Sequence, residues 1–371
     1  MPRLRLVLVG AGHAHAIVLE RWAASGLVAD ITVVTDDAAS LYSGMVPGWI
    51  AGEYDRSDLE LDARLMARRA GARLVLGRVE RVDSDARILQ LTDGTHVPYD
   101  IASLDLGSAT DRPTGGQEVT HVSAYDPDGI REALSAVGGG SVVVVGGGAA
   151  GVELAACARA VVDGSVTLVE SEEDVLGTHP ASVSRKVRRA LERLSVSVRT
   201  STAVTLDSMH DIDDVRDIDD VPVGPRAHPP GDVTIWATGA NAPALLAMSG
   251  LPVDGAGFVV VGDDLRVVGH DNLFAAGDCA SRQTTPDPKA GFHAIEQGKV
   301  LADNLAATAQ SWPKVPTSLR PYDLRSDFLT LLNLGNGRAL GVRWGLAVEG
   351  RWVRIVKDLV DRRFVRRFQD G

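Results

Sequence analysis

The sequence predicts an α/β fold built from two Rossmann-like units, the first of them discontinuous in the chain, with a smaller α/β segment at the carboxyl end. One arrangement occurs twice, over residues 4–35 and again over residues 141–170: an apolar strand, a glycine-rich turn, an apolar helix and a second strand. Apolar strands that end at glycine are typical of a parallel sheet buried on both faces. The length of 371 residues, of which 45% are hydrophobic and 23% charged, suits two or three compact units.

Composition and charge exclude several classes of protein. The 38 basic and 49 acidic residues give a net charge of −11, which argues against a nucleic-acid partner. Two cysteines, Cys157 and Cys279, are too few for a disulfide framework or a multi-cysteine metal centre, and we predict no bound metal. The apolar stretch 141–162 contains three consecutive glycines and two charged residues, so no transmembrane helix is predicted. We therefore expect a cytoplasmic protein that binds small molecules.

The second glycine turn fits the dinucleotide-binding pattern completely. Gly146, Gly148 and Gly151 follow an apolar strand, and Ala149 stands where a helix begins. Such a turn lets the backbone approach a pyrophosphate, and the N–H groups of the helix point at its charge. Glu170 ends the next strand, 22 residues after Gly148. A carboxylate there accepts both ribose hydroxyls and repels a 2′-phosphate, so we expect NADH to be preferred over NADPH. The alternative is a plain glycine turn.

The first glycine turn departs from that pattern at its third position. Gly10 and Gly12 are present, but His15 stands where the third glycine belongs, and Asp36 is the candidate ribose ligand after the second strand. Metal binding by the histidines would need further ligands at workable spacing, and none is nearby. We expect His13 and His15 to line the phosphate turn of a second dinucleotide, and assign catalysis to neither.

Three further segments resemble parts of flavoproteins with two dinucleotide folds. Residues 272–280 resemble the second flavin fingerprint, in which a strand ends in Gly-Asp and the aspartate binds the ribityl chain of FAD; these positions are Gly277 and Asp278. The resemblance also points to crossover segments between an FAD and an NAD domain, which contain Gly107, Ser108 and Gly239.

A helix that begins near Gly291, followed by Phe292, looks like the one beneath the flavin pyrimidine edge, where its positive end would stabilise negative charge. The resemblance implies roles for three more side chains, of which Lys289 and Glu153 are the candidate catalytic residues. Lys289 is expected to add a charge near the flavin or to be a solvated loop lysine. Glu153 is expected near the nicotinamide or on a solvent-facing helix surface, and Tyr42 to shield the flavin or to pack a loop.

The chain as a whole resembles the pyridine nucleotide-disulfide oxidoreductase superfamily, and within it the type II NADH dehydrogenase-like flavoproteins. The stretch 41–52, with the histidines of the first turn, looks like the flavoprotein module fused to selenide, water dikinase. The resemblance implies FAD as cofactor and NAD(P)H as substrate. It divides the chain into FAD-binding residues 1–110, NAD(H)-binding residues 111–240 with an acidic insert at 207–231, FAD-binding residues 241–320 and a carboxyl-terminal segment 321–371.

Two departures from these relatives narrow the chemistry. The disulfide reductases have a redox pair of cysteines in the region corresponding to 41–52, and this chain has none there, so thiol chemistry is not expected. Type II NADH dehydrogenases carry Ala-Gln-x-Ala-x-Gln beside the quinone, but Phe292 and Glu296 replace the glutamines here. We expect hydride transfer from NADH to the flavin, which then passes electrons to a quinone-like or other small acceptor. Two alternatives remain for the function: the chain reduces a protein electron carrier such as ferredoxin, or it is a low-turnover flavoprotein that serves as a redox sensor.

The carboxyl-terminal residues 351–371 combine an apolar pattern with basic charge. Seven Arg or Lys residues and three Asp give a local charge of +4. Six apolar residues recur at helical spacing, namely Trp352, Val356, Leu359, Val360, Phe364 and Phe368. The pattern fits an interfacial helix on the cytoplasmic membrane face. Packing on the flavin domain, or across a homodimer, would explain the same pattern.

Overall fold

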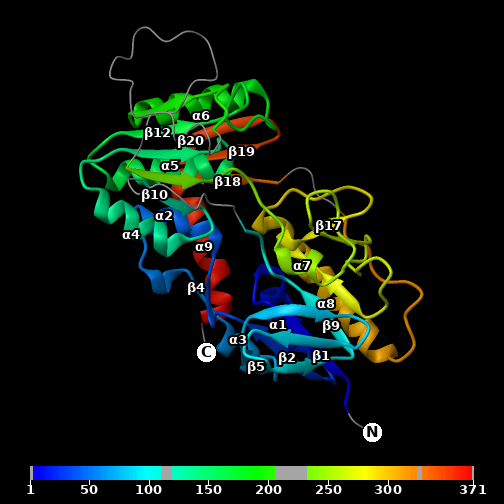
Figure 1. Cartoon of the computed structure of the whole chain (residues 1–371). Helices are drawn as coiled ribbons and strands as arrows, with labels where there is room; N and C mark the ends of the chain where they lie inside the picture. The colour runs from blue at the N-terminus through cyan, green and yellow to red at the C-terminus, as the bar shows by residue number, and fades with distance from the viewer. Residues whose placement is uncertain (1–2, 110–118, 205–231, 324–327, 370–371) are drawn as a thin grey trace.

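A computed structural model describes residues 3–109, 119–204, 232–323 and 328–369. The fold is mixed α/β with two five-stranded parallel sheets, each covered by helices, and a carboxyl-terminal antiparallel sheet followed by a long helix. Figure 1 shows the two sheets in separate units, with the last helix, α9, lying between them. The predicted fold class is confirmed. The acidic insert at 207–231 lies outside the described residues.

The first sheet has the strand order β16-β9-β1-β2-β5, and all its pairs are parallel. Its strands and main helices are β1 (Arg5–Val9), α1 (His13–Ser25), β2 (Asp30–Thr35), α3 (Ala63–Arg69), β5 (Arg73–Leu76), β9 (Ile101–Leu104), β16 (Leu273–Ala275) and α8 (Gly291–Ser311). The strand β16 returns to this sheet after the whole second unit, so the unit is discontinuous, as the sequence predicts. The helices α1 and α8 pack closely because Gly298 leaves no side chain between them: a Cβ there would lie 2.6 Å from the carbonyl oxygen of Ala14.

The second sheet has the order β10-β14-β11-β12-β13, again all parallel. Its elements are β10 (Thr120–Ser123), α4 (Pro127–Val137), β11 (Val142–Val145), α5 (Ala149–Val161), β12 (Val166–Val169), α6 (Ala181–Arg193), β13 (Val196–Arg199) and β14 (Val233–Trp236). The central strands are buried along their whole length, which explains why their sequences are runs of valine rather than alternating patterns.

Smaller elements connect these layers. The antiparallel sheet β6-β7-β8 comprises Val79–Asp83, Ile88–Leu91 and His96–Pro98; the pair β3-β4 comprises Ala39–Leu41 and Glu60–Asp62; the pair β15-β17 comprises Val259–Val261 and Ala280–Arg282. Short helices are η1 (Ser43–Met45), α2 (Val46–Ile50), η2 (Arg56–Asp58), α7 (Ala244–Met248) and η4 (Gly277–Cys279).

The carboxyl-terminal segment contains β18 (Thr330–Asn333), β19 (Ala339–Arg343) and β20 (Leu346–Gly350), followed directly by α9 (Arg351–Gln369). The helix α9 contacts its own sheet and also α1, α3 and β4 of the first unit. Its predicted apolar stripe is divided between two faces: Phe364 and Phe368 are buried, whereas Trp352 and Leu359 are 59% and 64% exposed. The reason is geometric, because about 100° per residue places Phe364 roughly 120° around the helix from Trp352.

Candidate functional site

A cavity of about 910 Å³ opens where the two parallel units face each other at the carboxyl ends of their strands. Open α/β sheets bind their ligands at this edge. The sequence-predicted residues that line it are Gly12, His13, Gly107, Ser108, Asp278, Lys289 and Gly291 for FAD, and Gly148, Ala149, Glu153 and Gly239 for NAD. The cavity therefore brings the two predicted cofactor sites together. Other predicted residues lie behind the wall or away from it.

The first glycine turn is shaped by close approach of its neighbours. Gly10 has φ +88°, and a Cβ there would lie 2.1 Å from the carbonyl oxygen of Asp105. A Cβ on Gly12 would lie 2.6 Å from a carboxylate oxygen of the same aspartate. His15, at the third glycine position, is accommodated by two hydrogen bonds of its ring, between Nδ1 and the Gly10 carbonyl at 2.7 Å and between Nε2 and Ser103 Oγ at 2.9 Å. Burial lowers the pKa of His15 to about 4, so its role is structural and neutral.

His13 is the first residue of α1 and lines the cavity. Its Nε2 is buried and has no hydrogen-bond partner among the described residues, and its ring centroid lies 5.4 Å from that of Tyr42. Buried polar atoms in folded proteins nearly always have a partner. Because His13 lines the cavity beside the glycine turn, its unpaired imidazole nitrogen fits a site that binds a polar ligand such as FAD.

Two predicted flavin residues face elsewhere. Asp36 is exposed after β2 and does not line the cavity, whereas its neighbour Asp37 does. The Tyr42 hydroxyl donates to Asp361 Oδ1 at 3.3 Å, and its ring centroid lies 4.7 Å from that of Phe364, so Tyr42 contacts α9. Burial and the Asp361 carboxylate raise the pKa of Tyr42 far above its ordinary range. Roles for Asp36 and Tyr42 toward the cofactor stay predictions.

The second glycine turn is equally constrained. Gly146 has φ +109°, and a Cβ there would lie 2.3 Å from the Ala237 carbonyl oxygen. A Cβ on Gly151 would lie 1.8 Å from the Gly146 carbonyl oxygen, so the third glycine allows helix α5 to approach the turn. The Glu170 carboxylate accepts the N–H of Gly147. The acid is thus held at the turn itself, beside the place where the ribose is expected.

The Gly277–Asp278 turn is held by a buried polar chain. The Gly277 N–H donates to Gln297 Oε1 at 2.7 Å, and Gln297 Nε2 donates to Asp287 at 2.8 Å. Burial raises the pKa of Asp278 to about 6, while the charge of Lys289 opposes the shift. Lys289 is not a solvated loop residue: its Nζ donates to the Ala280 carbonyl at 2.5 Å and lies 3.9 Å from the centroid of the Phe258 ring.

The helix α8 begins at Gly291, where the sequence places it, and its first turn lines the cavity. Phe292 is turned away and stacks on Phe328, with ring centroids 4.7 Å apart and planes at 10°. The position occupied by glutamine in type II NADH dehydrogenases is thus part of an aromatic pair here.

Sequence reasoning missed the closest charged partner of Glu153. Glu153 is not solvent-facing: its Oε1 accepts the N–H of Asn333 at 2.6 Å and lies 3.8 Å from Lys357 Nζ. Lys357, on the inner face of α9, is 4% exposed, donates to the Gly44 carbonyl at 2.8 Å and lies 3.1 Å from Asp361 Oδ2. Burial raises the pKa of Glu153, and Lys357 opposes that shift. The one indication of the Glu153–Lys357 pair in the sequence is that Lys357 stands among the apolar residues of the last helix.

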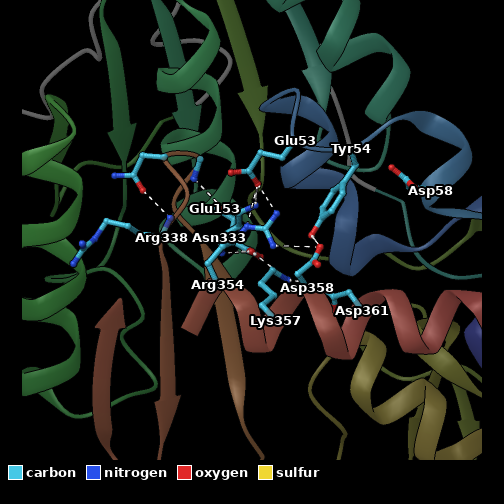
Figure 2. A network of polar contacts seen from close by, with 12 residues as sticks. Glu53, Tyr54, Asp58, Glu153, Asn333, Arg338, Arg354, Lys357, Asp358 and Asp361 are labelled. Atoms are coloured by element: carbon cyan, nitrogen blue, oxygen red, sulfur yellow. Dashed lines mark hydrogen bonds and ion pairs between the residues drawn. The ribbon is translucent and has the colours of Figure 1, made fainter. Parts of the chain in front are cut away.

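A second layer of the same network joins α9 to the loop after α2 (Figure 2). Arg354 lies 3.0 Å from Glu53 Oε2, and Asn333 Nδ2 donates to the same oxygen at 2.6 Å. The Tyr54 hydroxyl donates to Asp358 at 2.9 Å. Because Glu153 belongs to the second unit and Glu53 to the first, α9 ties both units to one side of the cavity.

The two cysteines offer no redox centre. Both are free and buried, and burial raises the pKa of Cys279 to about 12 and that of Cys157 well above its usual value. Within the described ranges, no group of three or more His, Cys, Asp or Glu side chains is arranged to hold a metal ion. No helix in the part of the chain that the structure describes is long and apolar enough to cross a membrane.

The chain resembles known proteins by family model, by sequence and by structure. The model of the family described as pyridine nucleotide-disulphide oxidoreductase matches residues 4–298. The chain is 29% identical over 337 residues to a probable ferredoxin reductase, CtmF, of Castellaniella defragrans, covering 84% of this chain and 78% of that one. It is 27% identical over 317 residues to the type II NADH:quinone oxidoreductase NdhA of Mycobacterium tuberculosis, covering 74% and 66%. The sulfide:quinone oxidoreductase structure from Aquifex aeolicus superposes with a TM-score of 0.76 at 16% identity over 99% of this chain and 92% of that one, a likeness of fold.

Proposed function

We propose, on the premise that this chain belongs to the pyridine nucleotide-disulphide oxidoreductase family, that it passes electrons from NADH to a quinone-like acceptor at a membrane surface. Membership of this family already implies the general activity: the chain is an oxidoreductase with FAD and NAD(P)H as its cofactors. FAD supplies the hydride acceptor and the onward electron donor. Glu170, held at the second glycine turn, supports the preference for NADH.

The proposal of a quinone-like acceptor rests on an exposed apolar surface on α9 and on the hairpin before it. We call this surface the docking surface. It consists of eight large side chains, each at least 36% exposed: Trp344, Leu346, Val348, Trp352, Ile355, Val356, Leu359 and Val360. Large exposed apolar patches mark sites of contact with partners or membranes. An amphipathic helix with such a face lies in the boundary between lipid headgroups and acyl chains, next to the apolar region in which lipophilic quinones dissolve.

The positive charge around the docking surface supports contact with a lipid membrane rather than with a partner in solution. Fewer of these charges are free than the sequence suggests. Four of the seven basic residues of the segment pair with acidic groups of the protein itself: Arg354, Lys357, Arg362 and Arg367. The other three, Arg351, Arg363 and Arg366, are exposed and form no ion pair within the described residues. Each free arginine near an anionic leaflet contributes about 1 kcal/mol of attraction.

The test of membrane contact is flotation with anionic liposomes. Deleting residues 351–371 would also remove Lys357 and Arg354, so point changes on the outer face are cleaner. Ile355→Glu with Leu359→Glu should abolish flotation while flavin stays bound. Val28→Glu is the matched control, because Val28 is 90% exposed and lies outside the docking surface. Unchanged flotation of the double variant removes the membrane proposal.

The acceptor itself is tested by steady-state NADH oxidation with a short-chain quinone, with ferricyanide and with a ferredoxin. We expect quinone reduction to be stimulated by liposomes in the original chain and not in the Ile355→Glu, Leu359→Glu variant. Very slow flavin reduction by NADH in stopped-flow measurements would instead favour a redox sensor.

A second candidate, reduction of an acidic protein carrier such as a ferredoxin, is favoured by one surface feature. A depression of about 500 Å³ on α6 is lined by Ser182, by one acidic residue, Glu349, and by four basic residues: Arg185, Lys186, Arg189 and Arg193. Basic patches of this kind steer acidic partners. Arg185→Glu with Arg189→Glu should raise the KM for ferredoxin at low salt if this candidate holds, and leave quinone reduction unchanged.

A further inference from the structure

Asp105 is a buried carboxylate placed between the two turns of the flavin site. It follows β9, which lies between β1 and β16 in the sheet, so it meets the turns at the ends of both neighbouring strands. A Cβ on Gly12 would lie 2.6 Å from its Oδ2, and a Cβ on Gly277 would lie 2.5 Å from its Oδ1. Asp105 is 4% exposed, lines the cavity and was not singled out by the sequence motifs.

No cation neutralises this carboxylate within the described residues. From α1, the nearest titratable groups are His13 and His15, and burial lowers the pKa of both rings, so they are neutral at pH 7. From η4, Asp278 and Cys279 face it: the carboxylate at Asp105 raises the pKa of each. Lys289 acts on Asp278 and Cys279 rather than on Asp105. The environment of Asp105 is therefore one of like charge and neutral groups.

Among the described residues, the Asp105 anion is stabilised at the start of helix α1, where two backbone N–H groups and the His13 ring lower its pKa. Its Oδ2 accepts the N–H of His15 at 2.9 Å, and the N–H of Ala14 contributes a second hydrogen bond. Both N–H groups belong to the first turn of α1. The diphosphate of FAD is expected to bind at this same helix end, against the Gly10–Gly12 turn. A helix terminus carries roughly half a positive charge, too little to balance a carboxylate and a doubly charged diphosphate together.

We propose that Asp105 is a proton-linked residue of the FAD site: the diphosphate binds at α1 only when Asp105 is the neutral acid, so each FAD that binds takes up one proton. The neutral carboxyl group keeps its place between the two glycine turns and removes the like charge from the phosphate site. This inference concerns cofactor binding and does not depend on which acceptor the enzyme reduces.

Linkage gives the sign and size of the effect. Burial raises the pKa of Asp105 to about 6 in the protein without flavin. Above that pH a proton must be added on binding, so the FAD dissociation constant rises tenfold per pH unit. Between pH 6 and pH 8 the affinity should fall about 50-fold, provided that Asp105 stays protonated in the complex. Neither the diphosphate nor the flavin ring titrates in this range.

The experiment is calorimetric titration of the flavin-free full-length protein with FAD at pH 7.5, in phosphate and in Tris buffer, whose ionisation enthalpies differ. The difference in apparent binding enthalpy should correspond to about one proton taken up per FAD. The same titration at pH 6 and pH 8 gives the change in affinity. An uptake near zero in the unaltered protein refutes the proposal, whatever any variant does.

Two variants assign the proton. Asp105→Asn keeps the shape of the side chain and should bind FAD with no proton uptake and an affinity that is flat from pH 6 to pH 8. Asp278→Asn tests the other cavity carboxylate whose pKa is raised; because Asp278 is expected to bind the ribityl chain, the affinity should fall, but the proton uptake per bound FAD should stay. Loss of the uptake in Asp278→Asn and its persistence in Asp105→Asn would overturn the assignment. Because the readout is binding, a failure of the quinone proposal does not affect it.

Discussion

Replacing Lys357 by methionine should destabilise the protein in a strongly pH-dependent way. The change removes a 4%-exposed cation that lies 3.8 Å from Glu153 and 3.1 Å from Asp361, and leaves both carboxyl groups buried without it. Breaking a buried ion pair from one side costs about 3–5 kcal/mol. We expect a loss of that size in the free energy of unfolding at pH 8.

The pH dependence follows from the two carboxyl groups. Burial raises the pKa of Glu153 and of Asp361 in the folded protein, and Lys357 counters both shifts. Without the lysine these pKa values rise further. A group whose folded-state pKa is raised stabilises the fold at low pH and loses that contribution as the pH rises through the folded pKa. The difference from the unaltered protein should therefore be much smaller at pH 5 than at pH 8.

The assay is urea unfolding at pH 5 and pH 8, followed by tryptophan fluorescence. Arg366→Met is the matched control, because Arg366 is an exposed cation on the same helix, and it should change the free energy of unfolding by less than about 0.5 kcal/mol. Adding Glu153→Gln to Lys357→Met should recover part of the loss, since the amide still accepts the Asn333 N–H without needing a cation. An equal loss at both pH values, or one no larger than that of Arg366→Met, would refute the charge-pairing argument.

Three further predictions test other parts of the molecule. Glu170→Ala should reduce the ratio of kcat/KM for NADH over NADPH at least tenfold while flavin stays bound; an unchanged ratio would mean that another acid holds the ribose. Gly12→Ala should abolish or strongly weaken FAD binding measured by absorbance after gel filtration, because its Cβ would lie within 2.7 Å of the Asp105 carboxylate; normal flavin content would contradict the close approach. Phe368→Ala should lower the free energy of unfolding by about 3–5 kcal/mol, because Phe368 is 1% exposed. Trp352→Ala should lower it by less than about 0.5 kcal/mol, because Trp352 is 59% exposed, and similar losses in the two variants would contradict the burial of only one face of α9.

The sequence was sufficient for those parts of the fold that depend on local backbone geometry. A glycine turn such as Gly146 to Gly151 needs positive φ and close helix approach, and only glycine supplies both, so the pattern can be recognised without knowing the rest of the chain. The return of β16 to the first sheet was predictable from a resemblance, because residues 272–280 resemble the second flavin fingerprint of flavoproteins with two dinucleotide folds. These features are encoded within about ten residues each.

The charged part of the site was not predictable in the same way. Glu153 and Lys357 are 204 residues apart in the chain and meet only because α9 packs between the two units. Asp105 ends a strand in a segment recognised for its glycine, and its burial depends on two turns contributed by distant strands. Such contacts are set by tertiary packing, and helical spacing and residue type alone do not predict which distant residues will meet. The division of the α9 stripe into two faces is a different case, because the helical repeat of about 100° per residue already separates Phe364 from Trp352.

The two faces of α9 connect the docking surface to the cavity. Its outer face carries Ile355 and Leu359, both at least 60% exposed, and the inner face of the same turns carries Lys357 beside Glu153. A helix transmits a displacement of one face to the other, because its backbone hydrogen bonds keep it rigid over a few turns. Contact with a bilayer would therefore hold in place the element that supplies the buried cation at the cavity. A membrane-dependent change in NADH oxidation that disappears in Lys357→Met but not in Arg366→Met would separate this coupling from simple access to quinone.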